Sequence, residues 1–116
     1  MLSTGYEDNE FDAVVAYSVL DHLCKIDADA ALVELLRITK PGGLLLFSFD
    51  IPEVHDYEYE HSLLPDGSMI YHGNNERDGM IFRPFSSEMI YDFVSPYEII
   101  YENTNRRGRC MVVIKK

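Results

Sequence analysis

Basic residues are scarce in this sequence, and their scarcity argues against one broad class of partner. The 116 residues include 10 Lys and Arg against 20 Asp and Glu, which gives a formal net charge of −10. Duplex nucleic acid is a polyanion that proteins normally bind through a basic surface. The one basic cluster, Arg106-Arg107-Gly108-Arg109, has the composition of a turn. We therefore expect no nucleic-acid partner.

Long apolar runs and cysteines are equally scarce. No run approaches the ~20 apolar residues needed to cross a bilayer, and the first residues include acidic side chains instead of a basic, apolar-cored signal segment. These absences predict a cytoplasmic protein with no membrane partner. The two cysteines, Cys24 and Cys110, match no metal-ligand spacing, and each lies beside apolar residues. They are expected to be buried free thiols.

The remaining composition is typical of a soluble globular protein, with 47% apolar and 26% charged residues. A chain of this length builds one hydrophobic core and is too short for two. We therefore expect a single domain over residues 1–116.

Two continuous apolar runs, Ala13–Tyr17 and Leu44–Phe49, have the pattern of strands buried on both faces of a parallel sheet. Between them, apolar residues recur at helical spacing from Ala28 to Ile38. Asp27 and Asp29 are expected to cap the start of this helix, and Pro41-Gly42-Gly43 is expected to end it. A strand, a helix and a second strand in this order form a right-handed crossover, so the two strands should be parallel.

The rest of the chain divides into an irregular segment, a helix and a hairpin. Within residues 51–83, Met69–His72 and Met80–Arg83 flank a Gly- and Asn-rich stretch, which predicts a hairpin or long flap. Ser86 is placed to cap a following helix. Tyr97–Glu102 and Cys110–Ile114 then form two strands joined closely enough to be antiparallel. Together these elements predict an α/β fold.

Several linear motifs resemble the C-terminal half of class I S-adenosylmethionine-dependent methyltransferases. The segment 7–15 resembles the entry to the family's fourth strand, and 18–23 resembles the loop that follows it. Residues 35–46, with their proline-diglycine turn, resemble the fifth strand and its approach, and 84–115 match the family's C-terminus in outline. The resemblance implies a partial Rossmann-like sheet with a C-terminal antiparallel hairpin. Residues 51–83 fall where the family places variable, substrate-facing insertions.

The resemblance also implies a function, together with one departure from the family pattern. Such enzymes transfer a methyl group from S-adenosylmethionine to an O, N or C nucleophile, here expected on a small molecule. The family holds the cofactor on a glycine-rich turn that has no counterpart before Phe11. We therefore expect this chain to bind S-adenosylmethionine weakly or not at all. One alternative is a non-catalytic half-domain that assembles with itself or another chain. A dehydrogenase-like nucleotide fold is less favoured, because the closing hairpin fits the methyltransferase pattern better.

Candidate site residues follow from the same placement. Ligands of open parallel sheets lie beyond the carboxyl ends of the strands, so the resemblance assigns the cofactor cleft to Tyr17, Ser18, Val19 and Leu20. His22 has the chemistry of a general base for an acceptor proton, or else fixes the loop onto the next helix. Four flap aromatics either line an acceptor pocket or pack the flap onto the core: Tyr57, Tyr59, Tyr71 and Phe82.

Metal ligation is not expected from the acidic part of the flap. Its candidate ligands are Glu53, His55, Asp56, Glu58 and His61. Their side chains have metal-ligand chemistry, but their spacing fits no sharp site, and an acidic loop is usually solvated.

The final expectation concerns strand order and assembly. The sheet should run Ala13–Tyr17, Leu44–Phe49, Cys110–Ile114, Tyr97–Glu102, with Cys110–Ile114 antiparallel to its neighbours. The outer edge of Ala13–Tyr17 then has no partner, and unprotected apolar edges pair with other chains. We expect a twofold homodimer through this edge, unless Met1–Asn9 or the flap folds over it.

Overall fold

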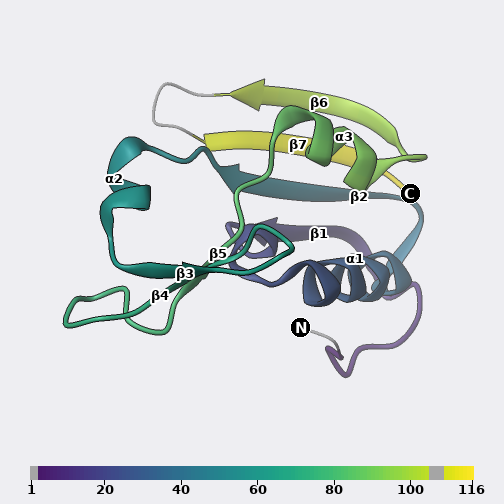
Figure 1. Ribbon diagram of the computed structural model, residues 1–116. Helices are drawn as coiled ribbons and strands as arrows, with labels where there is room; N and C mark the ends of the chain where they lie inside the picture. Colours follow the sequence, from purple (N-terminus) through teal and green to yellow (C-terminus); the bar gives the residue numbers. More distant parts are fainter. Residues whose placement is uncertain (1–2, 105–108) are drawn as a thin grey trace.

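The computed structural model describes residues 3–104 and 109–116, so the turn expected at Arg106-Arg107-Gly108 lies outside the described residues. The elements in chain order (Figure 1) are β1 (Phe11–Tyr17), the 3-10 helix η1 (Leu20–His22), α1 (Lys25–Ile38), β2 (Thr39–Asp50), α2 (Val54–Glu58), β3 (His61–Leu63), β4 (Met69–Tyr71), β5 (Ile81–Phe82), α3 (Ser87–Val94), β6 (Glu98–Thr104) and β7 (Arg109–Lys115).

The main sheet has the strand order β1-β2-β7-β6, which confirms the prediction. Strand β1 runs parallel to β2, and β7 is antiparallel to both of its neighbours. The apolar runs that predicted β1 and β2 pair in register, with Val15 opposite Leu46. The α/β fold with its closing antiparallel hairpin is therefore confirmed.

Helix α1 forms because Ala28, Ala31, Leu35 and Ile38 share one buried face. Its start differs from the prediction, since neither Asp27 nor Asp29 caps it. The amide of Lys25 instead donates to the Asp66 carboxylate from the flap, at 3.0 Å. Asp29 forms an ion pair with the Lys25 ammonium group, at 2.7 Å. The backbone amides of Lys25 and Ser68 lower the pKa of Asp66 to about 2.

The proline-diglycine turn lies inside the extended chain of β2, because α1 ends at Ile38 and β2 begins at Thr39. Gly42 has a φ of +79°, a left-handed angle that side chains disfavour. A Cβ on Gly43 would lie 2.8 Å from the carbonyl oxygen of Asp12 on the neighbouring strand. Both glycines therefore permit the irregular pairing of β1 with the start of β2.

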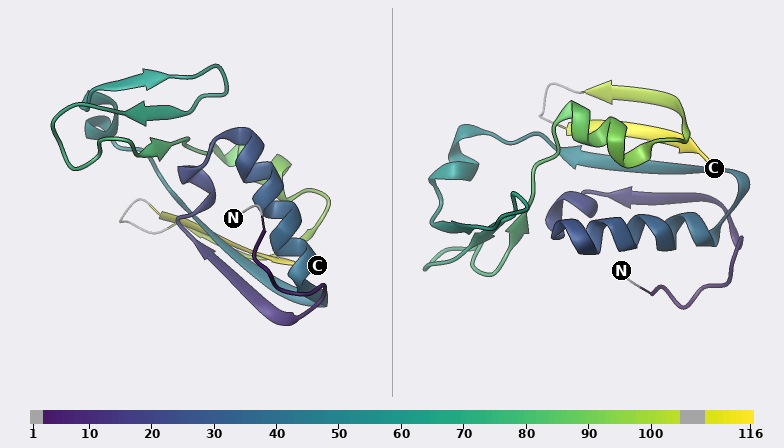
Figure 2. Two further views of the ribbon diagram at one scale, coloured as in Figure 1. Left: turned by 90° about the horizontal axis from the view of Figure 1, so that it is seen from below. Right: turned by 45° about the vertical axis from the view of Figure 1, so that its right-hand side comes forward.

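Helices α1 and α3 cover the same face of the main sheet (Figure 2). Beneath them lie the fully buried side chains Leu45, Phe47, Val112 and Ile114. Ser86 caps α3 as predicted, its Oγ accepting from the Met89 amide at 3.2 Å. Of the two cysteines expected to be buried, Cys110 is buried and Cys24 is only partly buried; both are free.

The opposite face of the sheet bears a row of apolar side chains across all four strands. The row, which we call the open face, consists of Val15, Leu46, Val113 and Tyr101 in direct register. Val15 is 65% exposed and Tyr101 50% exposed. These two residues lie on the edge strands β1 and β6, so the ends of the row are well exposed to solvent.

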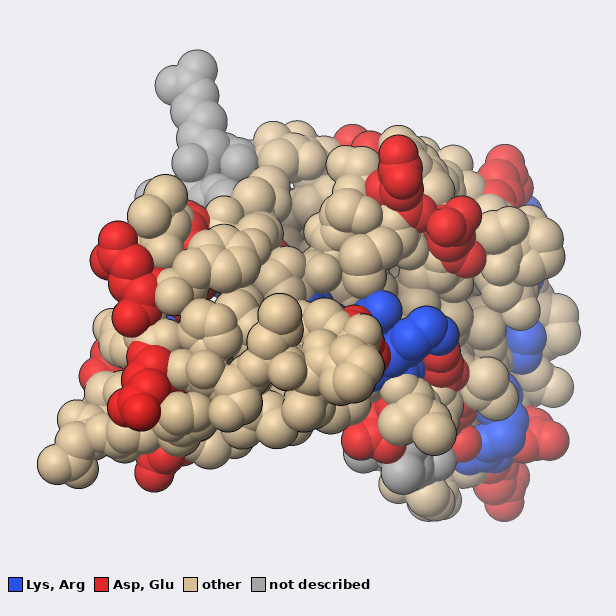
Figure 3. All heavy atoms as spheres, viewed as in Figure 1, with Lys and Arg blue, Asp and Glu red and all other residues tan. Residues whose placement is uncertain are grey.

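Residues 51–83, the flap, form a subdomain with its own three-stranded sheet, ordered β3-β4-β5. The predicted hairpin is confirmed as the β4–β5 pair, whereas β3 and α2 were not predicted. Its small core contains Met69, Tyr71 and Phe82. The flap lies beyond the carboxyl ends of β1 and β2 (Figures 1 and 2). On the face in Figure 3, acidic side chains lie at both ends of the molecule, and most of the visible basic side chains lie in the half away from α2.

The segment before β1 runs along α1. Thr4 donates to Glu34 through its amide and its hydroxyl, at 2.8 and 2.7 Å, and Arg37 donates to the carbonyl of Tyr6 at 2.7 Å. No strand among residues 3–104 and 109–116 pairs with the outer edge of β1. No described helix has the length and apolar character that crossing a bilayer requires.

Candidate functional site

A pocket of about 220 Å³ lies beyond the carboxyl ends of β1 and β2. One wall comes from η1 and the end of β2, and the other comes from the flap, including its helix α2. Its lining residues are His22, Asp50, Ile51, Glu53, His55, Asp56, Arg77, Met80 and Phe82. This is where open α/β sheets bind their ligands.

The imidazole of His22 is fixed on both of its nitrogens. Nδ1 lies 2.9 Å from the carbonyl oxygen of Ile81 in the flap. Because a carbonyl only accepts, Nδ1 carries a proton and donates it. Nε2 faces Oδ2 of Asp50 at 3.3 Å, and the ring stacks on Phe82 with centroids 5.4 Å apart. In the neutral ring, Nε2 therefore carries the lone pair and has the tautomer of a base.

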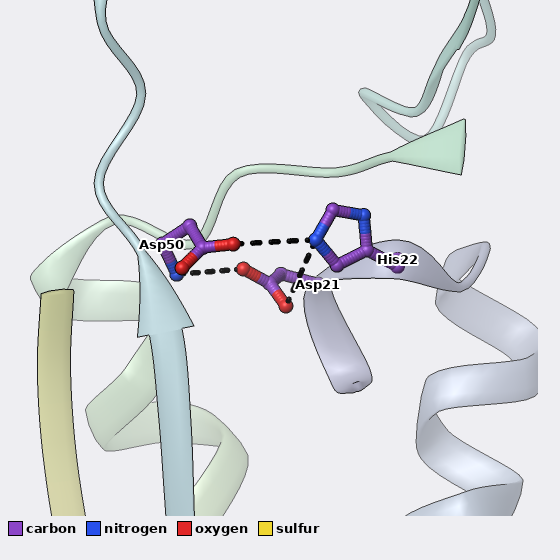
Figure 4. A group of neighbouring side chains, drawn as sticks. All are labelled: Asp21, His22 and Asp50. Atoms are coloured by element: carbon purple, nitrogen blue, oxygen red, sulfur yellow. Dashed lines mark hydrogen bonds and ion pairs between the residues drawn. The ribbon is translucent and has the colours of Figure 1, made fainter. Parts of the chain in front are cut away.

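Asp21 precedes His22 in η1 and is completely buried. Its Oδ2 accepts from the backbone amide of Asp50 at 2.7 Å, while Oδ1 has no hydrogen-bond partner among the described residues. Oδ1 lies 4.0 Å from Nε2 of His22 (Figure 4). Burial raises the pKa of Asp21, because the charged carboxylate has lost its water.

Asp50 connects Asp21 and His22 to Arg109, the first residue of β7. Its Oδ1 accepts from Nε of Arg109 at 3.1 Å and from the hydroxyl of Ser18 at 3.2 Å. The Arg109 guanidinium lies over the Tyr17 ring, 4.6 Å from its centroid, and donates to the Tyr17 hydroxyl. The hydrogen bond with Asp50 raises the pKa of Arg109. These contacts leave Oδ2 of Asp50 directed at His22.

The loop after β1 has an unusual backbone. Ser18 has a φ of +52°, in the left-handed region that non-glycine residues seldom occupy. Its amide donates to the Ser48 hydroxyl at 2.7 Å, which holds the loop against β2. Of the four predicted cofactor contacts, Tyr17 is half-exposed, Ser18 and Val19 are partly buried, and Leu20 is packed in the core. Strain held by neighbouring contacts often marks a binding loop.

The four candidate pocket aromatics do not line one pocket, because Tyr59, Tyr71 and Phe82 pack together in the flap core. Phe82 lines the pocket beside His22. Tyr71 is fully buried in the flap core, where its hydroxyl donates to the carbonyl of Asp56 at 2.9 Å. Tyr59 stacks beneath the Arg77 guanidinium at 4.2 Å, and Tyr57 is half-exposed on α2. Only Phe82 thus shares a pocket with His22.

The candidate metal ligands of the flap are also divided. Glu53, His55 and Asp56 line the pocket, and Glu58 and His61 do not. Arg77 forms an ion pair with Asp56 at 2.8 Å, which helps to lower the pKa of that carboxyl group. A different set converges more tightly: ligand atoms of Asp21, His22 and Asp50 all lie within 4.8 Å of one another.

Sequence reasoning missed several site residues, namely Asp21, Asp50, Arg77 and Arg109. Asp50 follows directly after the apolar run of β2, at the sheet edge where ligands bind. That position was the signal that could have identified it. Arg77 and Arg109 carry no such signal, because their partners are distant in sequence.

An open sheet with a polar pocket at its strand ends defines a Rossmann-like α/β protein. Residues 1–47 match the model of a methyltransferase domain family. An uncharacterized methyltransferase of Schizosaccharomyces pombe is 40% identical over 91 residues, covering 74% of this chain and 32% of the relative.

Solved methyltransferases share the fold. A SAM-dependent methyltransferase from Methanosarcina mazei superposes with a TM-score of 0.71 at 19% identity, over 99% of this chain and 63% of its own. A 1,6-didemethyltoxoflavin-N1-methyltransferase from Burkholderia thailandensis, solved with S-adenosylhomocysteine, gives a TM-score of 0.74 at 12% identity, over 99% and 48%.

The chain belongs to the class I S-adenosylmethionine-dependent methyltransferase family, as its motifs indicated. It spans about a third of the length of the curated relative it matches.

Proposed function

We propose that this chain is the acceptor-side part of an S-adenosylmethionine-dependent methyltransferase acting on a small molecule. The observation that carries the proposal is the strand-end pocket, in which His22 is held in one tautomer beside Asp50. The family match over residues 1–47 includes the loop that bears His22.

The pocket chemistry supports a nucleophile that carries a proton. Asp50, Glu53 and Asp56 contribute three carboxylates, and the cation Arg77 is already paired with Asp56. Such a lining favours hydroxyl or amine acceptors over carboxylate ones. When bound, S-adenosylmethionine would supply an electrophilic methyl group to the acceptor atom and would leave as a neutral thioether. The acceptor proton passes to Nε2 of His22, and Asp50 stabilises the resulting imidazolium.

The cofactor is expected beside Tyr17 and Ser18, with Val19 and Leu20 forming the base of the loop. Catalysis in such enzymes consists mainly of positioning donor and acceptor in line. These 116 residues alone are expected to bind S-adenosylmethionine weakly, because they contain no glycine-rich turn before β1 to donate backbone hydrogen bonds. Losing two or three hydrogen bonds at ~1 kcal/mol each lowers affinity about a hundredfold.

Two measurements test these proposals. Calorimetry with S-adenosylmethionine should give no micromolar dissociation constant, and a micromolar value for the monomer would contradict weak binding. Transfer of labelled methyl groups to a panel of small amines and alcohols, at high cofactor concentration, tests the reaction. His22→Gln should abolish transfer, and His72→Gln, at a half-exposed position of the flap outside the pocket, should leave it unchanged. Equal activity of both variants would contradict the role of His22.

Assembly with a second copy is an additional proposal, and the open face favours it. The outer edge of β1 is unpaired, and the side chains of Val15 and Tyr17 on this strand are exposed on the open face beside it. Neither lysine nor proline occurs in residues 11–20 to block edge pairing. Residues 3–10 lie along α1 and the flap lies beyond the strand ends, so neither supports the alternative that they cover this edge. A closed twofold contact satisfies such an edge most simply.

Sedimentation velocity at low micromolar concentration tests the homodimer. Val15→Lys places a charge on the edge strand and should give monomers. Val33→Lys is the matched control, because Val33 is 67% exposed on α1, away from the edge, and this variant should remain dimeric. A clean 13.4 kDa monomer of the unaltered chain would refute the homodimer. The alternative of a non-catalytic half-domain would then require a different chain as its partner.

A further inference from the structure

Three ligand atoms on η1 and β2 surround one point at the pocket wall. They are Oδ1 of Asp21, Nε2 of His22 and Oδ2 of Asp50, and all lie within 4.8 Å of one another. Nε2 lies 3.3 Å from the Asp50 oxygen and 4.0 Å from the Asp21 oxygen. Zinc binds such N and O ligands at ~2.1 Å, which in tetrahedral geometry separates neighbouring ligands by about 3.4 Å. The separation of Nε2 from the Asp50 oxygen matches this value, and the separation from the Asp21 oxygen exceeds it.

When His22 is neutral, no proton lies on Nε2 to form a hydrogen bond with the carboxylate oxygens of Asp21 and Asp50. The Ile81 carbonyl takes the proton on Nδ1, so Nε2 presents a lone pair to two acceptors. Oδ1 of Asp21 is independently conspicuous, because it is buried and has no hydrogen-bond partner among the described residues. Leaving a carboxylate oxygen buried and unsatisfied is costly. A cation or a proton between the three groups removes that cost.

In each of the three side chains, the polar atom that does not face this point forms a hydrogen bond that fixes the side chain. Oδ2 of Asp21 accepts from the Asp50 amide, and Oδ1 of Asp50 accepts from Arg109 and Ser18. Nδ1 of His22 donates to a backbone carbonyl. Metal ligands are characteristically oriented by such outer contacts, which also select the histidine tautomer. The three remaining ligand atoms therefore point inward together.

We propose that Asp21, His22 and Asp50 bind a divalent transition-metal ion, with a fourth coordination position open to the pocket. Three protein ligands with one open position are the pattern of catalytic zinc sites. An imidazole among the ligands favours Zn²⁺ over Mg²⁺, which prefers oxygen ligands and retains its waters. His22 and Asp50 both line the pocket, so the open position would face whatever occupies it.

The test is equilibrium dialysis of the full chain with ZnCl₂ after chelator treatment. We expect one Zn²⁺ per chain, with Mg²⁺ failing to compete. Asp21→Asn should weaken binding at least tenfold, since even the loss of outer contacts costs 10–100-fold. His72 and Glu60 form a separate pair 3.4 Å apart outside the pocket lining, so His72→Gln controls for surface binding and should change nothing.

A spectroscopic readout locates the ion without any activity. Substitution with Co²⁺ should give the strong visible absorption of a four-coordinate site, and loss of that absorption in His22→Gln would identify His22 as a ligand. Circular dichroism checks that each variant folds, and Asp50→Asn replaces Asp21→Asn if the latter does not.

Three results would overturn the metal site: no zinc bound, binding lost in His72→Gln, or binding unchanged in Asp21→Asn. A bound ion would occupy the Nε2 lone pair that the proposed proton transfer uses, so methyl transfer is measured on the metal-free chain. Failure of the metal site therefore leaves the proposed function standing.

Discussion

The contrast between the two sheet faces predicts that adjacent leucines differ sharply in their contribution to stability. Leu45 is 0% exposed beneath the helices, and Leu44, its neighbour in β2, is 40% exposed on the other side. Leu45→Ala removes a fully buried side chain and leaves a cavity that the rigid strand cannot close. Such changes cost 2–5 kcal/mol, and we expect about 3 kcal/mol. Leu44→Ala should cost less than about 1 kcal/mol, because much of that side chain already contacts water.

Urea unfolding followed by circular dichroism measures the difference. With a slope of about 2 kcal/mol per M for a protein of this size, Leu45→Ala should lower the midpoint by roughly 1.5 M. The Leu44→Ala midpoint should move by less than about 0.5 M. Equal losses in the two variants would refute the assignment of a covered and an open face. Loss in Leu44→Ala that grows with protein concentration would instead show that a second copy covers the open face.

Two further predictions concern helix ends. Ser86→Ala removes the side chain that caps α3 and should lower the free energy of unfolding by about 1 kcal/mol; Ser87→Ala, one residue inside the helix, should have a much smaller effect in the same urea titration. Asp66 has a folded pKa of about 2, below its ordinary 3.8, so its stabilising effect is present above about pH 4 and is lost as the pH falls toward 2. Asp66→Asn should be less stable than the unaltered chain at pH 7, with midpoints that converge at pH 2, and a constant difference across that range would count against the carboxylate contact with Lys25.

The main sheet could be predicted because its signals are local. Two apolar runs, a helical repeat and a short-linked hairpin each identify one element, and crossover handedness fixes how they join. Strand β3 escaped prediction because it has three residues and Leu63 is 70% exposed, so it lacks an apolar pattern. Helix α2 was missed for the same reason, since none of its residues is buried.

The site could be predicted only in part. His22 was identified from its own chemistry and its place after a buried strand. Its partners Asp50 and Ile81 lie 28 and 59 residues away, and no spacing rule joins such positions. Asp21 was overlooked because an aspartate in a short polar loop ordinarily faces water. Tyr71 shows the converse, since an aromatic proposed for a pocket forms the core of the flap.

The bond that sets the His22 tautomer ends on the main-chain oxygen of Ile81. Every amino acid supplies that oxygen, so no replacement at position 81 deletes it while β5 keeps its place. Side chains of the flap can therefore change in size and charge without altering which nitrogen of His22 holds the proton. The flap backbone thus preserves the protonation of His22, while the flap side chains are free to change and to adapt the pocket to new ligands.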